Sequence, residues 1–572
     1  MLVNRRHAHR HSDSQSLLLN LHGWRVKFLS FLLLLSFAAL LLRGIYLLIV
    51  SGDFLQEKGS SRYLREMNIV AMRGKITDRN GKLLAVSTPM RAIWAIPQDA
   101  RGMNAHQKSL LAHLLKMSEA DLTQKLASDK NFVYLNRRVS PESALKIAQL
   151  QIAGIHEEKT YKRFYPLSAL TAHVVGFTGI QDNGLEGAEL AFERELLGID
   201  GKRVVLRDRR GHIIEDVKAI QAPLNGKDIT LSIDAHLQYV AFTHLKETVL
   251  KHRAKAGSVV VINPHNGDIL AMANYPSYNP NNLNKNAQNA WRNRAVTDTF
   301  EPGSALKPFT VALALEKGTH RYESVVDTSS TGHFTIGANT ISDIRAYGNL
   351  TVAQVIQKSS NIGAAKIGLA QKPEDLWQTL NDLGFGQSPN VGFPGEGKGR
   401  LRNWKHWREV EQATMSYGHG ISVSLLQLAR AYSVFARSGD LVSLSFKKSN
   451  VMKTAGVEIF SDQTVREMRA ILELTTQDGG TGVRARIPGY RVGVKTGTAN
   501  KIESGNYVKK YVSDCVGIAP LSNPQLVVAV AIDEPSENGF YGGVVAAPLF
   551  AKVMGNALHY LGIPEDATEE KA

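Results

Sequence analysis

The stretch Phe300 to Phe309, FEPGSALKPF, places a serine and a lysine directly after a Pro-Gly turn. The residues that follow, up to Gly318, are apolar on most faces and predict a buried helix. Ser304 then lies at the mouth of that helix, where free backbone N–H groups favour developing negative charge. Lys307 follows one turn later on the same side, with Cβ atoms roughly 5–6 Å apart. This arrangement is typical of a nucleophile beside its base.

The pattern of serine with lysine three residues later is not specific alone, because it also occurs at Ser143 and Ser445. Around Ser143, Ser140 can cap a helix and Pro141 suits its first position, so an ordinary helix start explains the segment. Ser445 lies on a polar edge. A lysine in a buried helix is different, because it is costly without a partner and desolvation lowers its pKa. We therefore take Ser304 and Lys307 as the candidate pair.

Length and composition predict a globular protein of several domains. The chain has 572 residues, of which 43% are hydrophobic, and a formal charge of +16. An excess of basic residues favours binding to nucleic acid, to an anionic membrane or to an anionic polymer. The sequence has no zinc-finger spacing, RNP signature or Walker loop, so we predict no nucleic-acid partner. The single cysteine, Cys515, excludes an internal disulfide and is expected to be a buried thiol.

Residues 28–50 form an apolar run, interrupted only by Arg43-Gly44, that predicts a transmembrane anchor. Twenty-three helical residues reach roughly 35 Å, enough to cross a bilayer. A cleaved signal peptide is the alternative, but its apolar core should be shorter and end in a small-residue site. The preceding residues carry a net charge of +4 and residues 51–66 carry none. The positive-inside rule therefore predicts a cytoplasmic basic tail over 1–27 and an outer remainder.

The outer portion changes character near Gly226. Residues 51–225 mix short apolar runs with turns, and RGKITDRNGKLLA (73–85) predicts a hairpin at Asn80-Gly81. Residues 226–565 read as a second domain, followed by a flexible tail over 566–572. Its expected strands lie near both ends, with helices between them, which indicates an α+β fold. The expected strands are GSVVVIN (257–263), GDILAMA (267–273), RVGVKTGT (491–498), SDCVGIAP (513–520) and LVVAVAI (526–532).

Two further polar motifs occur in this domain. Thr351 can cap a second helix that runs through Ser359-Ser360-Asn361, where the polar trio could cap a break or supply a hydroxyl relay and an amide. Lys495-Thr496-Gly497 occurs once, and Gly497 would let a substrate backbone approach the strand closely. Strict alternation puts Lys495 and Thr496 on opposite faces, so local twist is expected to bring both to one site.

The ordered trio Ser304-x-x-Lys307, Ser359-x-Asn361 and Lys495-Thr496-Gly497, spaced by 55 and 136 residues, resembles the penicillin-recognising serine transpeptidases. Further stretches are similar to class B penicillin-binding proteins, most of all to the penicillin-binding protein 3 group of cell-division transpeptidases. They cover most of residues 70–560: RGKITDRNGKLLA (73–85), RFYPLSALTAHVVGFT (163–178), GLEGAEL (184–190), ILAMANYPSYNPN (269–281), GGTGVRARIPGYRV (479–492) and YGGVVAAPLF (541–550).

The resemblance implies a role for each motif residue. Lys307 takes the proton of Ser304, which attacks a D-Ala carbonyl, and the backbone N–H groups of Ser304 and Thr498 form the oxyanion hole. Ser359 relays a proton to the departing D-Ala, and Asn361 holds Lys307 and the substrate amide. The substrate carboxylate is bound by Lys495, Thr496, Gly497 and Thr498. Neither a metal nor a cofactor is implied.

The resemblance also implies the fold and the partners. It predicts an elongated N-terminal pedestal for docking or dimerisation and a transpeptidase domain with an antiparallel sheet flanked by helices. Expected ligands are D-Ala-D-Ala stem peptides, an amine acceptor and β-lactams, and expected partners are a glycan polymerase and other division proteins. The expected location is the inner membrane at the division septum, with the catalytic domain in the periplasm.

Departures from the family pattern and rival functions remain open at this point. Ser360 stands where serine β-lactamases commonly have Asp, and Val494 stands where many relatives have Gly. The sequence has no Glu-x-x-Leu-Asn segment that resembles the water-activating element of class A β-lactamases, which favours slow deacylation. The alternatives are an elongation transpeptidase, a β-lactamase or carboxypeptidase, and a non-catalytic penicillin-binding sensor.

Overall fold

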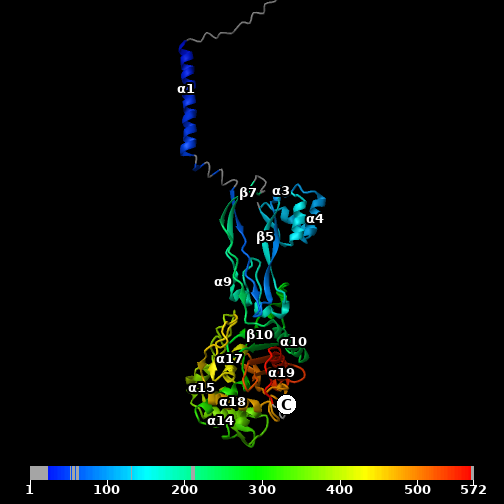
Figure 1. The fold of residues 1–572 in the computed structure, drawn as a ribbon, viewed down its shortest axis with the longest axis vertical. Coiled ribbons are helices and arrows are strands. Elements are labelled where there is room, and N and C mark those ends of the chain that lie inside the picture. Colours follow the sequence, from blue (N-terminus) through cyan, green and yellow to red (C-terminus); the bar gives the residue numbers. More distant parts are fainter. Residues whose placement is uncertain are drawn as a thin grey trace, which may run out of the picture. The chain divides into compact units, whose positions relative to one another are not determined.

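A computed structural model describes residues 23–51, 53–54, 58, 64–130, 132–207 and 213–567 (Figure 1). The chain divides into two compact units, residues 1–68 with 202–222, and residues 69–201 with 223–572. Most of the predicted tail over 1–27 and all but two residues of the predicted tail over 566–572 lie outside the described residues.

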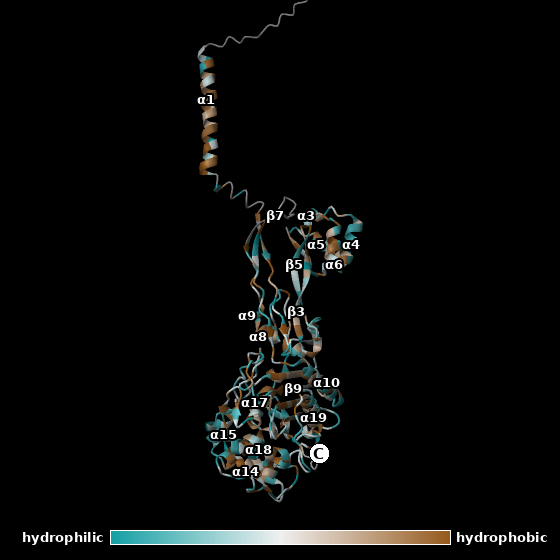
Figure 2. Cartoon of the chain, viewed as in Figure 1, coloured by the Kyte–Doolittle hydropathy of each residue, from teal (hydrophilic) through white to brown (hydrophobic). Residues whose placement is uncertain are grey.

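The first unit contains an apolar helix near the N-terminus. Helix α1 (Gly23–Ile45) continues into one wider turn, Tyr46–Val50, and within these 28 residues an 18-residue window has a mean hydropathy of 2.4. Figure 2 shows it as hydrophobic over most of its length, and none of its residues is buried. At 1.5 Å per residue it reaches about 42 Å, so it is long enough to cross a membrane. The same unit contains most of a three-stranded sheet of β1 (Leu64–Ile69), β6 (Gly201–Arg207) and β7 (Ile213–Gln221).

The N-terminal part of the second unit is built on one long strand, β3 (Leu83–Ala95). The predicted hairpin is confirmed, because β2 (Ile76–Thr77) pairs antiparallel with β3 and Gly81 adopts φ 86° between them. Strand β3 also pairs with β4 (Val133–Val139) and β5 (Ile155–Phe164). Three helices share an apolar cluster with these strands: α4 (Ala105–Leu115), α5 (Glu119–Leu126) and α6 (Pro141–Gln149).

Helix α6 contains the second copy of the SALK sequence. It begins after Ser140, whose hydroxyl accepts the backbone N–H of Ser143 at 3.3 Å. Ser143 and Lys146 are therefore residues of an ordinary capped helix, as predicted.

A buried ionic cluster lies in the same part of the chain. Arg73 donates from Nε to Glu189 Oε2 at 2.7 Å, and Arg163 donates from Nε to Glu189 Oε1 at 2.6 Å. All three residues are at most 4% exposed. A carboxylate between two buried guanidinium groups holds this region together, because removing it would leave buried Arg163 without its counter-ion and Arg73 with Glu193 alone.

The C-terminal part of the second unit is centred on a five-stranded antiparallel sheet in the order β10-β9-β21-β20-β19. All five predicted strands are confirmed: β9 (Ala256–Ile262), β10 (Ile269–Tyr275), β19 (Gly493–Glu503), β20 (Asn506–Ala519) and β21 (Leu526–Asp533). Cys515 lies on β20 and is a buried free thiol, as expected.

Helices cover both faces of this sheet (Figure 1). Val259 and Val261 pack in one apolar cluster with α10 (Ala235–Lys251) and α19 (Gly542–Tyr560). Val260 and Ile262, which alternate with them, belong to the cluster that contains α17 (Leu425–Ala436). A strand buried on both faces needs apolar residues at every position, and this explains the unbroken run GSVVVI.

The predicted second helix is two helices. Helix α13 (Val352–Lys358) ends at Ser359, which adopts the left-handed conformation with φ 60° and ψ 38°. Ser360 then caps α14 (Asn361–Leu369) by accepting the backbone N–H of Gly363 at 2.9 Å. Of the two readings of the polar trio, the capped break is therefore confirmed, because a single left-handed serine redirects the chain between two segments that each satisfy helix patterning.

The remaining elements connect these layers. The longer helices are α12 (Lys307–Glu316), α15 (Pro373–Asp382), α16 (Glu409–Met415) and α18 (Asp462–Leu474). Short helical turns are α3 (Pro97–Ala100), α7 (Ala172–Val175), α8 (Gly187–Ala191), α9 (Glu193–Leu196), α11 (Arg294–Thr297), Ser168–Leu170, Lys285–Ala290, Gly303–Leu306, Trp404–His406 and Val483–Ala485. Short strands are β8 (Ile229–Thr230), β11 (Thr299–Phe300), β12 (Val325–Asp327), β13 (His333–Ile336), β14 (Asn339–Ser342), β15 (Asn349–Thr351), β16 (Val423–Ser424), β17 (Asp440–Leu441) and β18 (Val457–Glu458).

Candidate active site

A cleft of about 670 Å³ opens beside β19, the edge strand of the five-stranded sheet. Five of the eight predicted site residues line it: Ser304, Ser359, Asn361, Thr496 and Thr498. The other three, Lys307, Lys495 and Gly497, lie directly behind these residues, as the contacts below describe.

Ser304 lies in a turn of 3₁₀ helix, Gly303–Leu306, that leads into α12. Two contacts fix this turn: the Gly303 N–H donates to Gly418 O at 3.1 Å, and the Tyr432 hydroxyl donates to Ala305 O at 2.8 Å. Ser304 is partly exposed to the cleft, whereas Lys307 is fully buried. A rigid turn thus presents the hydroxyl to the cleft.

The Lys307 ammonium is held by the segment around Ser359. Its Nζ donates to Ser359 O at 2.6 Å, to Asn361 Oδ1 at 2.8 Å and to Ser359 Oγ at 3.3 Å. Within the described residues no hydrogen bond reaches the Ser304 hydroxyl, and the hydrogen bonds of Lys307 go to Ser359 and Asn361. Burial lowers the pKa of Lys307 well below its usual value, and nearby Lys495 lowers it further. A lowered pKa makes a lysine side chain easier to deprotonate, which suits it to the role of a base.

Asp343 holds the Ser359–Asn361 segment in place, and the sequence reasoning missed it. Its Oδ2 accepts the Ser360 hydroxyl at 2.5 Å, and its Oδ1 accepts the N–H groups of Asn361 at 2.5 Å and Ile362 at 3.2 Å. The carboxylate therefore caps the positive end of α14. It follows β14 at a distance in sequence from the motif, and no local pattern distinguishes it.

Lys495 connects the third motif to the first two. Its buried Nζ donates to Ser359 Oγ at 2.9 Å and to Thr496 O at 3.0 Å. Thr496 and Thr498 point the other way and line the cleft. The alternation was therefore predicted correctly, but the expected local twist is not needed, because the long lysine side chain reaches Ser359 from the far face.

Gly497 serves a packing purpose that differs from the one predicted. A Cβ on Gly497 would lie 2.6 Å from Asp514 Oδ1 and 2.6 Å from the carbonyl oxygen of Pro302. Its bare Cα faces a buried carboxylate and the turn that carries the nucleophile. The glycine therefore lets Asp514 and the turn Gly303–Leu306 pack against β19, and the close approach of a substrate backbone stays a prediction.

Burial and the neighbouring Asp514 carboxyl shift the pKa of Lys495 in opposite directions. Burial lowers the pKa of Lys495 to about 8, and Asp514 opposes this shift. Asp514 is fully buried, and neither of its oxygens accepts a hydrogen bond of normal geometry within the described residues, although the nearby Gly497 amide favours its charged form. Burial raises the pKa of Asp514 well above its usual value. Near neutral pH, Lys495 is therefore protonated more readily than Lys307.

Aromatic and ionic groups border the cleft beyond the motifs. Tyr511 stacks on Phe540 with ring centroids 4.1 Å apart, and both line the cleft. Glu301, just before the nucleophile turn, accepts the Gly420 N–H at 2.8 Å and the Tyr507 hydroxyl at 3.0 Å. Glu301 therefore links that turn to the β19–β20 hairpin.

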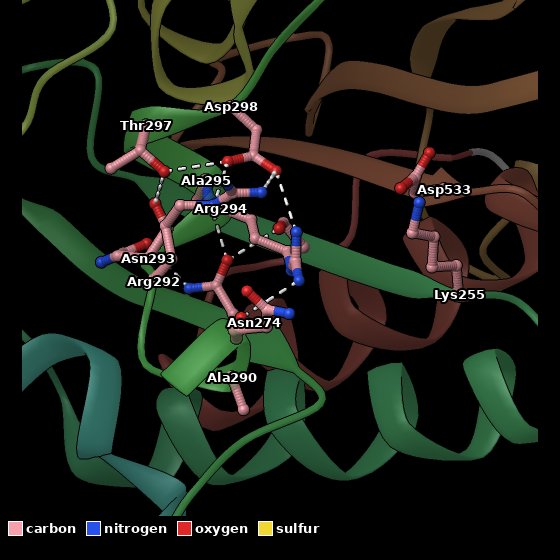
Figure 3. Close-up of polar contacts among 12 residues, drawn as sticks. Lys255, Asn274, Ala290, Arg292, Asn293, Arg294, Ala295, Thr297, Asp298 and Asp533 are labelled. Carbon is pink, nitrogen blue, oxygen red and sulfur yellow. Dashed lines mark hydrogen bonds and ion pairs between the residues drawn. The ribbon is translucent and has the colours of Figure 1, made fainter. Parts of the chain in front are cut away.

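A second cavity, of about 320 Å³, lies over the sheet next to β9 and β11. Its polar wall is already paired: Asp298 accepts hydrogen bonds from Arg292, Arg294 and Thr297, as Figure 3 shows. The Asn274 amide beside it donates to Asn293 Oδ1 at 2.8 Å. This cavity holds none of the motif residues, and the chemistry belongs to the first cleft.

The structure thus brings all eight predicted residues to one place, whereas Ser143 and Ser445 lie elsewhere. A serine at a helix mouth, a buried lysine of lowered pKa and a second hydroxyl between two lysines define a serine acyltransferase type of site.

Comparison with known proteins identifies the family. Residues 257–555 match the penicillin-binding protein transpeptidase domain, and residues 68–231 match the penicillin-binding protein dimerisation domain. The chain belongs to the class B penicillin-binding proteins. The predicted boundaries, 51–225 and 226–565, differ from these matches, since the first match runs to residue 231, and they stay predictions.

Named relatives extend over nearly the whole chain. The probable peptidoglycan D,D-transpeptidase PenA of Neisseria gonorrhoeae is 43% identical over 544 residues, covering 94% of this chain and 93% of that protein. The peptidoglycan D,D-transpeptidase FtsI of Escherichia coli K12 is 39% identical over 555 residues, covering 96% and 94%.

Solved structures agree with these relatives. The apo transpeptidase domain of Burkholderia pseudomallei penicillin-binding protein 3 is 46% identical with a TM-score of 0.55, covering 59% of this chain and 98% of that one. A peptidoglycan synthetase from Bifidobacterium adolescentis is 25% identical with a TM-score of 0.71, covering 88% and 98%.

Proposed function

We propose that this chain is a membrane-anchored serine D,D-transpeptidase that cross-links peptidoglycan stem peptides through an acyl-enzyme on Ser304. The observation that carries the proposal is the shared hydroxyl of Ser359, which receives hydrogen bonds from both Lys307 and Lys495 beside the nucleophile turn. This chain of polar groups can move a proton between nucleophile, base and leaving group within one buried network.

Acylation begins with the transfer of the Ser304 proton to neutral Lys307. The hydroxyl oxygen attacks the carbonyl carbon of the penultimate D-Ala, and the negative oxygen is stabilised by the backbone N–H groups of Ser304 and Thr498. The two N–H groups can act together because the turn that carries Ser304 lies close to Thr498. A Cβ on Gly303 would lie 3.4 Å from Thr498 O.

Release of the terminal D-Ala requires a proton on its nitrogen. Ser359 passes this proton from Lys307, and Asn361 orients Lys307 while it contacts the substrate amide. Charged Lys495 with Thr496 and Thr498 binds the terminal carboxylate. An amine from a second stem peptide then attacks the ester carbon, which forms the cross-link and returns the proton to Ser304.

The apolar helix α1 supports an anchor in the inner membrane with the catalytic domain in the periplasm. The resemblance to cell-division transpeptidases supports action at the division septum together with a glycan polymerase and other division proteins. β-Lactams are expected to acylate Ser304, and deacylation of the resulting acyl-enzyme is expected to be slow.

The proposal is tested with the full chain in detergent micelles, a stem pentapeptide donor and an amine acceptor. Release of D-Ala and formation of the new amide are measured by mass spectrometry in the wild type, in Ser304→Ala and in Ser143→Ala, which alters the other SALK sequence. We expect Ser304→Ala alone to abolish both products. Persistent product in Ser304→Ala would overturn the proposal.

A further inference from the structure

One end of the cleft carries two cations that the motif residues do not explain. Lys358, the last residue of α13, and Arg484, in the short turn Val483–Ala485, both line the cleft. Within the described residues neither forms an ion pair with an acidic side chain, whereas the neighbouring Arg486 and Arg491 pair with Asp478 and Glu473. The positive charges of these two side chains are therefore available to an anionic ligand.

The segment that carries Arg484 is rigid. The Gly482 N–H donates to Thr475 O at 2.8 Å, and Thr475 itself is fully buried and donates to Val494 O at 2.7 Å. Lys358 Nζ donates to Gly479 O at 3.0 Å, which joins the two cations through one loop. Lys358 is thus held against this fixed backbone, and the exposed side chain of Arg484 extends from the same segment.

Asp343, the acidic residue that lines the same cleft, does not neutralise them. Its two oxygens already accept hydrogen bonds from Ser360, Asn361 and Ile362. An anionic ligand therefore meets two cations that form no ion pair with this carboxylate within the described residues.

The position of these cations identifies the ligand, given the proposed function. Thr496 Oγ1 donates to Thr481 Oγ1 at 3.2 Å, so the loop bearing Arg484 adjoins the strand that binds the terminal carboxylate. Lys358 directly precedes Ser359, which protonates the departing amine. Both cations consequently lie on the leaving-group side of the site.

The acceptor amine enters from this same side. Attack of an amine on the acyl-enzyme is the reverse of amine departure in the first step, so both amines pass through the same place. The new C–N bond forms as the ester C–Oγ bond of Ser304 breaks, and the proton of the amine returns through Ser359 and Lys307 to Ser304. Groups around the departing D-Ala therefore also contact the acceptor.

We propose that Lys358 and Arg484 form a subsite for a carboxylate of the acyl acceptor, additional to the carboxylate held by Lys495, Thr496 and Thr498. The acceptor is then an amine on a molecule that carries at least two carboxylates. This inference rests on the proposed function and extends it to the chemical class of the second substrate.

The test compares two acceptors of equal shape, D-glutamate and D-glutamine, which differ only in the charge of the side-chain terminus. The full chain in detergent is acylated with a thioester donor, and the partition between aminolysis and hydrolysis is measured for each acceptor. Penicillin labelling counts the active sites of every variant. We expect the wild type to favour D-glutamate by about fivefold to tenfold, the effect of one or two exposed charge contacts.

Arg484→Gln and Lys358→Gln are each expected to reduce this preference, and Arg484→Glu to reverse it in favour of D-glutamine. Arg466→Gln, which alters an exposed arginine on α18 outside the cleft, is the matched control and should keep the wild-type preference. The inference is overturned if the wild type shows no preference, or if Arg484→Gln and Arg484→Glu both keep it. Absence of penicillin labelling on wild-type Ser304 would instead overturn the proposed function and the inference with it.

Discussion

Replacement of Asp343 by Asn tests how the Ser359–Asn361 segment is held. The carboxylate accepts three hydrogen bonds at the N-terminus of α14, from Ser360, Asn361 and Ile362. Asn keeps one acceptor oxygen but loses the negative charge and the second acceptor. Hydrogen bonds to a charged group contribute about 1.5–3 kcal/mol each, and the helix dipole adds up to about 1 kcal/mol at such a site.

Because Asn retains part of this bonding, we expect the variant to lose about 2 kcal/mol of stability. For a domain of about 300 residues, that corresponds to a fall in Tm of about 3 °C. Asp343 also raises the pKa of Lys307, so its neutralisation lowers that pKa further and moves the acid limb of the acylation profile to lower pH. The maximal rate of acylation should fall about tenfold, or ~1.4 kcal/mol, because the acceptors of Lys307 are displaced.

The assay is the rate of penicillin adduct formation against pH, followed by intact mass, together with thermal unfolding. Asp462→Asn is the matched control, because Asp462 is an exposed acid in the first turn of α18 and pairs with exposed Arg466. It should change stability by less than about 1 kcal/mol. An unchanged rate and acid limb in Asp343→Asn would refute the assigned role of this carboxylate.

Three further predictions concern buried groups. Gly497→Ala should abolish acylation, because its Cβ would clash with Asp514. The double variant with Asp514→Ala should recover part of the acylation rate. If it recovers none, the packing role of the glycine is contradicted. The pKa of Lys495, about 8, predicts that acylation by a penicillin declines as the pH rises through 8, because the ammonium is lost. Asp514→Asn removes a charge that raises this pKa, so the decline should begin at lower pH, and a shift to higher pH would contradict it. Glu189→Gln should destabilise the N-terminal part of the second unit by about 3–5 kcal/mol, measured by limited proteolysis, and resistance equal to the wild type would count against the buried cluster.

The five strands of the sheet could be predicted because burial on both faces demands unbroken apolar runs, and such runs are visible in the sequence. The apolar N-terminal helix could also be predicted, because its long apolar run is visible in the sequence. The break at Ser359 could be named only as an alternative, because the residues on either side both satisfy helix patterning and only one backbone conformation separates them.

The motif residues were predicted because their order and spacing carry the signal, whereas their supports carry none. Asp343 acts on residues 17 to 19 positions away through a loop without regular pattern. Asp514 stands opposite Gly497 on the neighbouring strand, and only the strand register shows that the two meet. Pairings of this kind depend on tertiary structure, which a single sequence does not reveal.

The central claim is that Ser304 is the nucleophile, and peptide mapping of the penicillin adduct tests it most directly. The full chain is incubated with a penicillin, digested, and the peptide that carries the added mass is sequenced by mass spectrometry. The account predicts a stable adduct on Ser304 that persists for hours, is lost in Ser304→Ala and remains in Ser143→Ala. An adduct on another residue, or rapid turnover of the penicillin without a stable adduct, would contradict it.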